Sequence, residues 1–249
     1  IVTRAARLLA EARRPLLILG GGTTGAAPEA RALAARLGAA SFVTSAGRGV
    51  IAPGDPLHFG SFLARPDSAR EIARADVVLV AGCALSETDL WRETPGFGDH
   101  ARVIRLDIDP AILAADTRSE LRLAGDAAAG LAMIGAALGQ GAAASDWQPD
   151  RIDAARRRWF AEIDADRPGL LAVIGALREA LPPEAMVFSD MTQIAYAAVE
   201  AWPAPAPRLW HHPSGFGTLG YALPAAIGAA VGRPEVPVVA LAGDYGVQY

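Results

Sequence analysis

The sequence predicts an α/β fold built from two parallel-sheet units with helices on both faces. The first observation is that short apolar segments rich in Val, Ile and Leu alternate with longer helical segments. Continuously apolar strands separated by helices are typical of parallel sheets that are covered on both faces. The second observation is that this alternation stops in a stretch rich in Gly and Ala and then begins again. We therefore predict two three-layer units along the chain.

The first unit is predicted to span residues 1–138. Its strand candidates are apolar runs bounded by turns, a pattern typical of buried strands. They lie at 15–20, 40–44, 76–81 and 102–107. Helical segments separate most of them, and the clearest lie at 4–13, 27–37 and 127–138.

Residues 139–150 lack periodicity and are predicted to link the two units. A second alternating series then fills residues 151–249. Helices are expected at 151–163, 168–180, 192–202 and 220–231, and strands at 185–190, at 208–211 and from 238 onwards. Proline alternates with alanine over 203–207, so we expect a stiff surface connection there.

The composition excludes several classes of partner. The chain has 249 residues, of which 52% are apolar, and its formal net charge is −4. Acidic and basic residues are interspersed, so we expect no nucleic-acid partner and no membrane partner. The longest near-apolar run, 219–232, contains a proline and is too short to span a bilayer. A single cysteine, Cys83, excludes an internal disulfide and fits a reducing compartment, so we expect a cytoplasmic protein.

A glycine-rich segment in the first unit resembles a dinucleotide-binding fingerprint. Residues 20–25 match G-x-G-x-x-G between a strand and a helix. A nucleotide site of this kind needs an acidic residue about 20 positions further on, which holds the ribose hydroxyl. The next strand, 40–45, carries no carboxylate. We therefore interpret the segment as a tight turn that needs glycine, and keep a non-catalytic NAD- or flavin-binding module as the alternative function.

The most informative residues lie at the end of the chain. A glycine-rich turn at 214–220 opens a helix of small residues, and the chain returns as an apolar strand that leads to Gly243 and Asp244. A lone carboxylate at the carboxyl end of a parallel strand lies where open α/β sheets bind ligands. Asp244 is therefore a candidate binding residue.

These segments resemble the thiamine-diphosphate-binding domain of the acetohydroxyacid synthase and 2-oxo acid decarboxylase superfamily. The resemblance implies that Asp244 is the metal ligand, because Mg²⁺ takes oxygen ligands and commonly bridges phosphates to one or two protein groups. Residues 1–138 are similar to the Rossmann-like central domain of the same superfamily, and the matching segments are 14–22, 44–49, 55–58, 75–79 and 105–110. The resemblance implies that residues 151–249 form an incomplete, truncated thiamine-diphosphate domain. It also implies that Asp107 and Asp109 end a strand and start a helix, rather than bind a metal.

The resemblance implies a set of cofactor-binding residues: Thr192, Gln193, Gly217, Thr218, Leu219, Gly243, Asp244, Tyr245 and Gly246. The Gly217 carbonyl and the Leu219 N–H would bind the aminopyrimidine ring of thiamine diphosphate, and the Leu219 side chain would force its two rings into a V shape. Thr192 and Gln193 would contact the diphosphate at a helix N-terminus, which favours anions. Tyr245 stands where the family usually has glycine. For His211 and His212, substrate contact and an ordinary place at a strand end both stay open.

The resemblance implies a thiamine-diphosphate- and Mg²⁺-dependent enzyme acting on a small-molecule 2-oxo acid. It would release an aldehyde as a decarboxylase or form a carbon–carbon bond as an acetolactate synthase-like carboligase, with a slight lean towards decarboxylases of basic or bulky substrates. Flavin-binding relatives carry a Gly-x-Arg pattern where this chain has Ala84, so we expect no FAD. The family's activating glutamate lies in an N-terminal domain of the neighbouring subunit. The catalytic residue is therefore not identified within residues 1–249, and we expect a homodimer or homotetramer.

Overall fold

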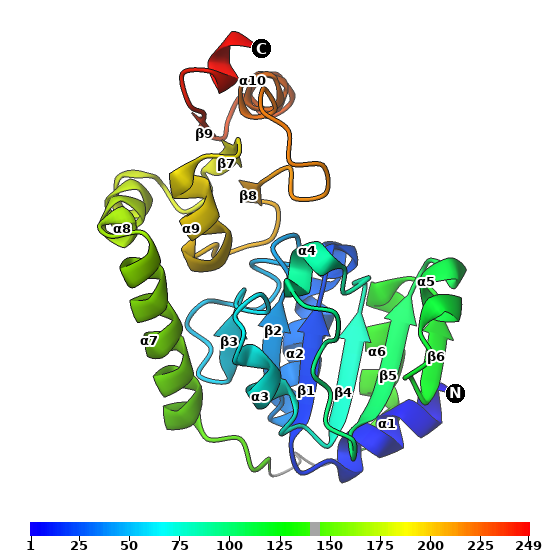
Figure 1. Cartoon of the computed structure of the whole chain (residues 1–249). Helices are drawn as coiled ribbons and strands as arrows, with labels where there is room; N and C mark the ends of the chain where they lie inside the picture. Colours follow the sequence, from blue (N-terminus) through cyan, green and yellow to red (C-terminus); the bar gives the residue numbers. More distant parts are fainter. Residues whose placement is uncertain (140–144) are drawn as a thin grey trace.

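The computed structural model describes residues 1–139 and 145–249, and it confirms the α/β fold class. It contains a six-stranded parallel sheet and a three-stranded parallel sheet. In Figure 1 the smaller sheet lies beyond the ends of the larger sheet's strands. Within these described residues, no helix is both long enough and apolar enough to cross a membrane.

The larger sheet has the strand order β3-β2-β1-β4-β5-β6, and every pairing in it is parallel. Its strands are β1 (Pro15–Leu19), β2 (Ala40–Val43), β3 (His58–Gly60), β4 (Val77–Ala81), β5 (Arg102–Asp107) and β6 (Leu121–Ala124). The strand order reverses between β1 and β4, where open sheets of this type form a crevice. Four of these strands were predicted, whereas β3 and β6 were not.

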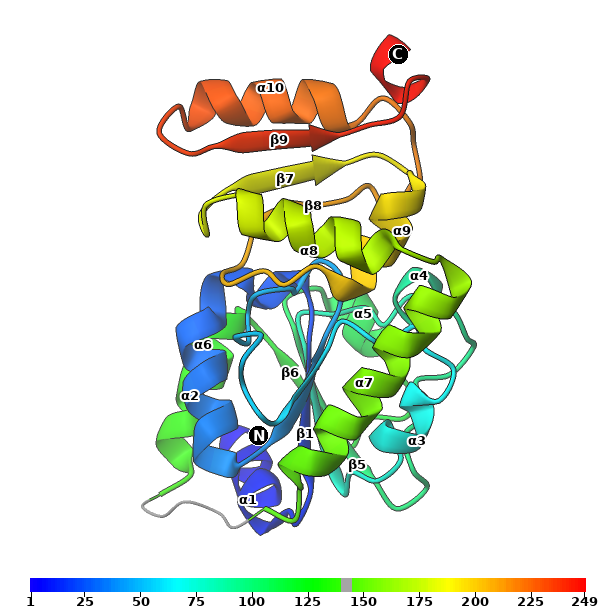
Figure 2. The same cartoon turned by 90° about the vertical axis from the view of Figure 1, so that its left-hand side faces the viewer.

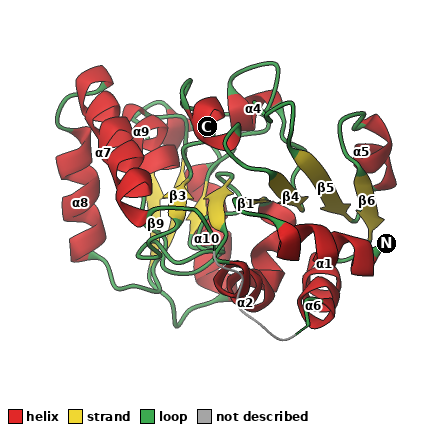
Figure 3. Ribbon diagram, turned by 90° about the horizontal axis from the view of Figure 1, so that it is seen from below, coloured by secondary structure: helices red, strands yellow, loops and turns green. Residues whose placement is uncertain are grey.

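Helices cover both faces of the larger sheet. One face carries α1 (Val2–Glu11), α2 (Ala27–Leu37) and α6 (Ala127–Ala137), which Figure 3 shows together on one side. Shorter helices follow the strands: η1 (Gly21–Ala26), α3 (Ser68–Ile72), α4 (Glu87–Leu90) and α5 (Pro110–Ala115). In β1, Leu17 and Leu19 pack in the cluster under α1, α2 and α6, while Leu16 and Ile18 pack in the cluster on the opposite face. Burial on both faces explains why this strand is continuously apolar.

The long helix α7 (Pro149–Asp166) covers part of the opposite face and runs beside β3 (Figure 1). Its Trp159 is fully buried, and the ring centroids of Phe42, Phe59 and Phe62 lie 6.0, 5.9 and 5.2 Å from its own. The sequence placed this segment in the second unit, yet it packs on the first sheet. The division into residues 1–138 and 151–249 stays a prediction, and residues 140–144 of the expected linker lie outside the described part.

The smaller sheet has the strand order β8-β7-β9, again parallel. Its strands are β7 (Met186–Ser189), β8 (Trp210–His211) and β9 (Val238–Leu241), and its helices are α8 (Leu170–Ala180), α9 (Gln193–Ala201), α10 (Ala222–Gly232) and the short η2 (Gly246–Gln248). Met186 and Phe188 of β7 pack towards α10, whereas Val187 packs in the cluster with α8 and α9. Figure 2 shows this sheet between its helices, with the strands running in one direction.

Candidate active site

The glycine turn between β8 and α10 depends on two left-handed residues. Gly217 has φ +70° and Gly220 has φ +78°, a region that side chains other than glycine rarely adopt. A Cβ atom on Gly220 would also lie 2.7 Å from the Tyr249 side chain. The turn is closed by a 2.7 Å hydrogen bond from the Gly217 N–H to the Pro213 carbonyl. The geometry explains why glycine recurs in this segment.

The groups that the resemblance assigns to the aminopyrimidine ring are available in this turn. Within the described residues, the Gly217 carbonyl and the Leu219 N–H make no hydrogen bond to the protein. The Leu219 side chain is 42% exposed, so it can contact a ligand. The Thr218 hydroxyl donates to the Leu219 carbonyl at 2.7 Å, which is a local contact within the turn. One free acceptor and one free donor beside an apolar side chain fit a planar ring with polar edges.

Asp190, at the end of β7, holds the start of α10. Its carboxylate is fully buried and accepts hydrogen bonds from the N–H groups of Gly220, Tyr221 and Ala222 at 3.1, 2.9 and 2.7 Å. The first N–H groups of a helix have no partner within the helix, so a carboxylate there satisfies them. Asp190 is absent from the predicted site residues. Its position directly after a buried strand and before Thr192 was the only signal in the sequence.

The candidate metal loop, 243–246, follows β9 and reaches the same carboxylate. Gly246 is buried, and a Cβ atom on it would lie 2.2 Å from Asp190 Oδ2. Asp244 is exposed, and its backbone carbonyl accepts a hydrogen bond from Gln248 Nε2 at 3.1 Å. Within the described ranges, no group of three or more His, Cys, Asp or Glu could hold a metal ion. A single carboxylate at Asp244 would suit Mg²⁺, which keeps waters and phosphate oxygens in its shell.

Thr192 and Gln193 lie at the N-terminus of α9. The Thr192 hydroxyl oxygen accepts from the Ala195 N–H at 3.2 Å and so caps the helix, while Gln193 is exposed. The structure therefore brings the predicted residues to one edge of the smaller sheet. The turn, the metal loop and the start of α9 all follow the carboxyl ends of its strands, and Asp190 contacts the first two directly.

The two histidines before the turn differ in their surroundings. The ring of His211 stacks on Phe188 with centroids 4.4 Å apart, and its Nε2 contacts the Arg208 carbonyl. His212 Nδ1 lies 2.9 Å from the Ser189 hydroxyl, and its side chain lines a cavity. Burial lowers the pKa of both imidazoles, which favours their neutral forms. His211 therefore packs against Phe188, whereas the His212 side chain lines the cavity.

Two buried arginines of the first unit contact the second. Arg48, after β2, donates to the Ala198 carbonyl of α9 at 2.8 Å and lies over the Trp210 ring. Burial lowers its pKa to about 9, partly offset by the Glu200 carboxylate. Arg65 forms an ion pair with Glu200 of α9, and the two side chains are only 9% and 15% exposed. These contacts hold α9 against the carboxyl-end edge of the first sheet.

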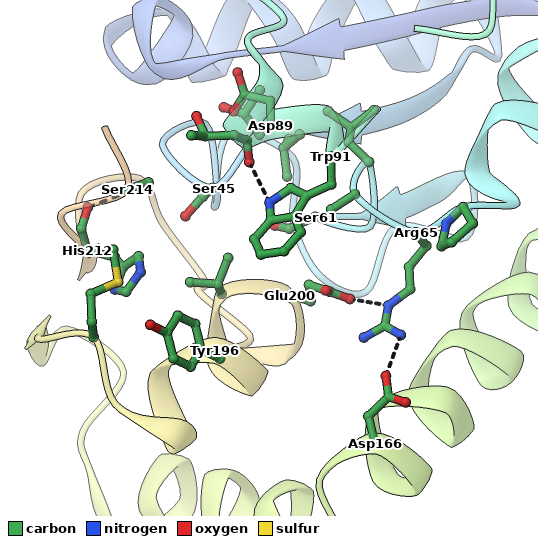
Figure 4. A pocket seen from close by; sticks show the side chains of 18 of the residues that line it. Ser45, Ser61, Arg65, Asp89, Trp91, Asp166, Tyr196, Glu200, His212 and Ser214 are labelled. Carbon is green, nitrogen blue, oxygen red and sulfur yellow. Dashed lines mark hydrogen bonds and ion pairs between the residues drawn. The ribbon is translucent and has the colours of Figure 1, made fainter. Parts of the chain in front are cut away.

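A cavity of about 430 Å³ lies between the two units (Figure 4). Its walls include Ser45, Ser61, Arg65, Asp89 and Trp91 from the first unit and Met191, Tyr196, Glu200, His212 and Ser214 from the second. Figure 4 shows Arg65 between the carboxylates of Glu200 and Asp166. Met191 lines the cavity and also packs beside the glycine turn, because a Cβ atom on Gly217 would lie 3.3 Å from Met191 Cε. The cavity is therefore adjacent to the candidate cofactor segments.

The glycine-rich segment of the first unit brings two strand ends together. A Cβ atom on Gly20 would lie 2.2 Å from the Gly82 carbonyl oxygen, and one on Gly22 would lie 2.8 Å from Gly82 Cα. Cys83 follows in the same loop, and burial raises the pKa of its thiol to about 12, so the thiolate is disfavoured. These glycines are thus accounted for by close backbone approach after β1 and β4.

Two family models match the chain. Residues 2–134 match the central domain of thiamine pyrophosphate enzymes, and residues 190–249 match their C-terminal thiamine pyrophosphate-binding domain. The second match begins at Asp190 and includes every predicted site residue.

Curated relatives agree with these matches. Over 98% of its length the chain is 42% identical to a probable 2-ketoarginine decarboxylase of Pseudomonas aeruginosa, of which it covers 44%. It is 34% identical to a sulfoacetaldehyde acetyltransferase of Rhodobacter capsulatus, over 97% of the chain and 46% of that protein. It is 28% identical to an acetolactate synthase of Mycobacterium leprae, over 98% of the chain and 40% of that protein. The chain thus spans less than half the length of these relatives. Since the central-domain match alone covers more than half of its residues, the chain belongs to the thiamine pyrophosphate enzyme family.

Proposed function

We propose that this chain is part of a thiamine-diphosphate- and Mg²⁺-dependent enzyme that decarboxylates a 2-oxo acid. The observation that carries the proposal is the convergence of two segments on the Asp190 carboxylate: the glycine turn, through the Gly220 N–H, and the loop at 243–246, through Gly246. The Gly217 carbonyl and the Leu219 N–H also support it, because they leave one acceptor and one donor free in the turn that the family uses for its cofactor.

The chain's own residues would bind and orient the cofactor. Thiamine diphosphate, when bound, supplies the carbon nucleophile and the ring that takes up electrons as CO₂ leaves. Leu219 would pack between its two rings, and the Gly217 carbonyl and Leu219 N–H would fix the pyrimidine. Asp244 would ligate Mg²⁺ and so compensate the diphosphate charge. The start of α9, with Thr192 and Gln193, would add N–H groups that favour an anion.

The substrate we propose is a 2-oxo acid with a basic side chain. The relative with 42% identity over nearly the whole chain, a probable 2-ketoarginine decarboxylase, supports this choice. Carboligation is the second candidate, and the matches to acetolactate synthases support it. We further propose that the enzyme is cytoplasmic, works as a homodimer or homotetramer, takes its activating carboxylate from another domain and binds no FAD.

The test is calorimetry followed by turnover on the full-length enzyme. We expect thiamine diphosphate to bind in the presence of Mg²⁺, and NAD and FAD to give no heat of binding. With both cofactors present, the enzyme should release CO₂ from 2-oxo-5-guanidinopentanoate faster than from pyruvate. Binding of NAD or FAD without thiamine diphosphate would instead support the non-catalytic nucleotide-binding module.

A further inference from the structure

We propose that Asp190 is a positioning residue for the cofactor, which fixes the turn carrying Leu219 relative to the loop carrying Asp244. The inference rests on the proposed function, since it assigns to Asp190 the geometry of that same site. Asp190 itself would touch no cofactor. It acts through the backbone of residues 220–222 and through Gly246.

The Asp190 carboxylate is held rigidly and uses both oxygens. Its backbone N–H donates to the Leu241 carbonyl of β9 at 2.9 Å, so the residue continues the pairing of the central strand β7. Oδ1 accepts from the N–H groups of Tyr221 and Ala222, and Oδ2 accepts from that of Gly220. Gly220 directly follows Leu219. A shift of the carboxylate would therefore move the Leu219 side chain with it.

The second contact of Asp190 explains the glycine at position 246. Oδ2 occupies the space that a side chain at Gly246 would need, because a Cβ atom there would lie 2.2 Å away. Gly246 has an ordinary negative φ, so space rather than backbone conformation requires glycine here. Gly246 lies two residues after Asp244. The buried Asp190 side chain thus sets the distance between the turn that would bind the rings of thiamine diphosphate and the loop that would bind Mg²⁺.

The chemistry of the carboxylate is specific to this position. A carboxylate accepts hydrogen bonds, and all three hydrogen-bond partners of the Asp190 side chain are backbone donors. In Asp190→Asn, an NH₂ group must replace one oxygen and face a backbone N–H, so one hydrogen bond is lost and two donors are opposed. Hydrogen bonds to charged groups are stronger than neutral ones, and a buried donor left without a partner adds its desolvation cost.

The experiment measures thiamine diphosphate affinity and cofactor-free thermal unfolding in the full-length enzyme, at saturating Mg²⁺. We expect Asp190→Asn and Gly246→Ala each to weaken thiamine diphosphate binding tenfold or more while the folded fraction stays above nine-tenths at the assay temperature. Asp126→Asn is the matched control, because Asp126 caps α6 with one hydrogen bond and is exposed. Its affinity should match that of the wild type.

A double variant separates positioning from a general loss of stability. In the Asp190→Ser background the shorter side chain leaves room for a methyl group at position 246. Gly246→Ala should then weaken binding less than threefold, although it costs tenfold or more in the wild type. Such non-additivity is expected of residues that contact each other and not of distant, independent sites.

Two results would overturn the inference. One is wild-type affinity in Asp190→Asn and Gly246→Ala, even with a lowered unfolding temperature, since that is the outcome of a merely structural role. The other is an equal effect of Gly246→Ala in both backgrounds. If the wild-type enzyme itself fails to bind thiamine diphosphate, the proposed function fails instead, so the two failures are distinguishable. Should Asp190→Asn not fold, Gly246→Ala alone still decides between these outcomes.

Discussion

Leu219→Ala should reduce turnover far more than it reduces stability. The side chain is 42% exposed, so it has little packing to lose. A fully buried Leu→Ala change costs about 2.7–5.0 kcal/mol, and a half-exposed site that opens to solvent should cost about 1 kcal/mol. The loss in kcat should be tenfold or more, equivalent to at least about 1.4 kcal/mol in the activation barrier, because the bent cofactor geometry would no longer be enforced.

The matched control is Leu223→Ala. Leu223 is 37% exposed and lies on α10, one turn beyond the glycine segment, so its truncation should cost similar stability. Leu219→Met and Leu219→Ile keep most of the side-chain volume and should retain activity. The assays are chemical unfolding without cofactor and steady-state decarboxylation by the full-length enzyme. Equal kcat values for Leu219→Ala and Leu223→Ala would refute the proposal that Leu219 packs between the two rings of the cofactor.

Three further predictions concern pH, flavin and the isolated chain. Burial lowers the pKa of His58 from 6.5 to about 3, so the contribution of its neutral imidazole to stability is complete above pH 6.5 and is lost as the pH falls towards 3. The free energy of unfolding should therefore fall between pH 6.5 and pH 3, and it should fall less steeply in His58→Gln. The purified enzyme should show no flavin absorbance, since Ala84 replaces the arginine of flavin-binding relatives, and stoichiometric FAD would contradict this. Residues 1–249 expressed alone should release no CO₂ from a 2-oxo acid above a heat-killed control, because we propose that the activating carboxylate comes from another domain, and a site without that domain neither excludes water nor holds the reacting groups in register.

The sequence predicted most of the long elements because their patterns are local. Four strands of the first sheet, and all strands and helices of the second part except the short η2, lie within a few residues of their expected places. The elements that escaped are short. Strand β3 has three residues, and α3 and α4 have five and four, too few to show a period. Strand β6 does alternate, with Leu121 and Leu123 inward, so its signal was present and overlooked.

The sequence-based account of Asp107 and Asp109 holds in the structure. Asp109 caps α5 by accepting from the Ala111 N–H, and the Asp107 carboxylate accepts from the Asp109 N–H. Local motifs of this kind involve residues only a few positions apart, so a single sequence can reveal them. The glycine turn is also local, because its left-handed residues need glycine regardless of their surroundings.

The remaining features of the site depend on distant contacts. Asp190 bonds to backbone groups about thirty positions away, and Arg65 meets Glu200 across the boundary between the units. The packing of Trp159 on the first sheet likewise joins segments far apart in the chain. No periodicity or spacing marks such pairs, since they arise only when two elements pack together. The cavity between the units could not be predicted for the same reason.

In the proposed function, this chain holds thiamine diphosphate through Mg²⁺ on Asp244. The most direct test is the dissociation constant of thiamine diphosphate across a Mg²⁺ titration, for the wild type, for Asp244→Ala and for Glu184→Ala, an exposed control that loses the same charge. We predict that Asp244→Ala weakens binding at limiting Mg²⁺ at least tenfold and removes most of its Mg²⁺ dependence, while Glu184→Ala matches the wild type. Wild-type affinity of Asp244→Ala at limiting Mg²⁺ would contradict the account.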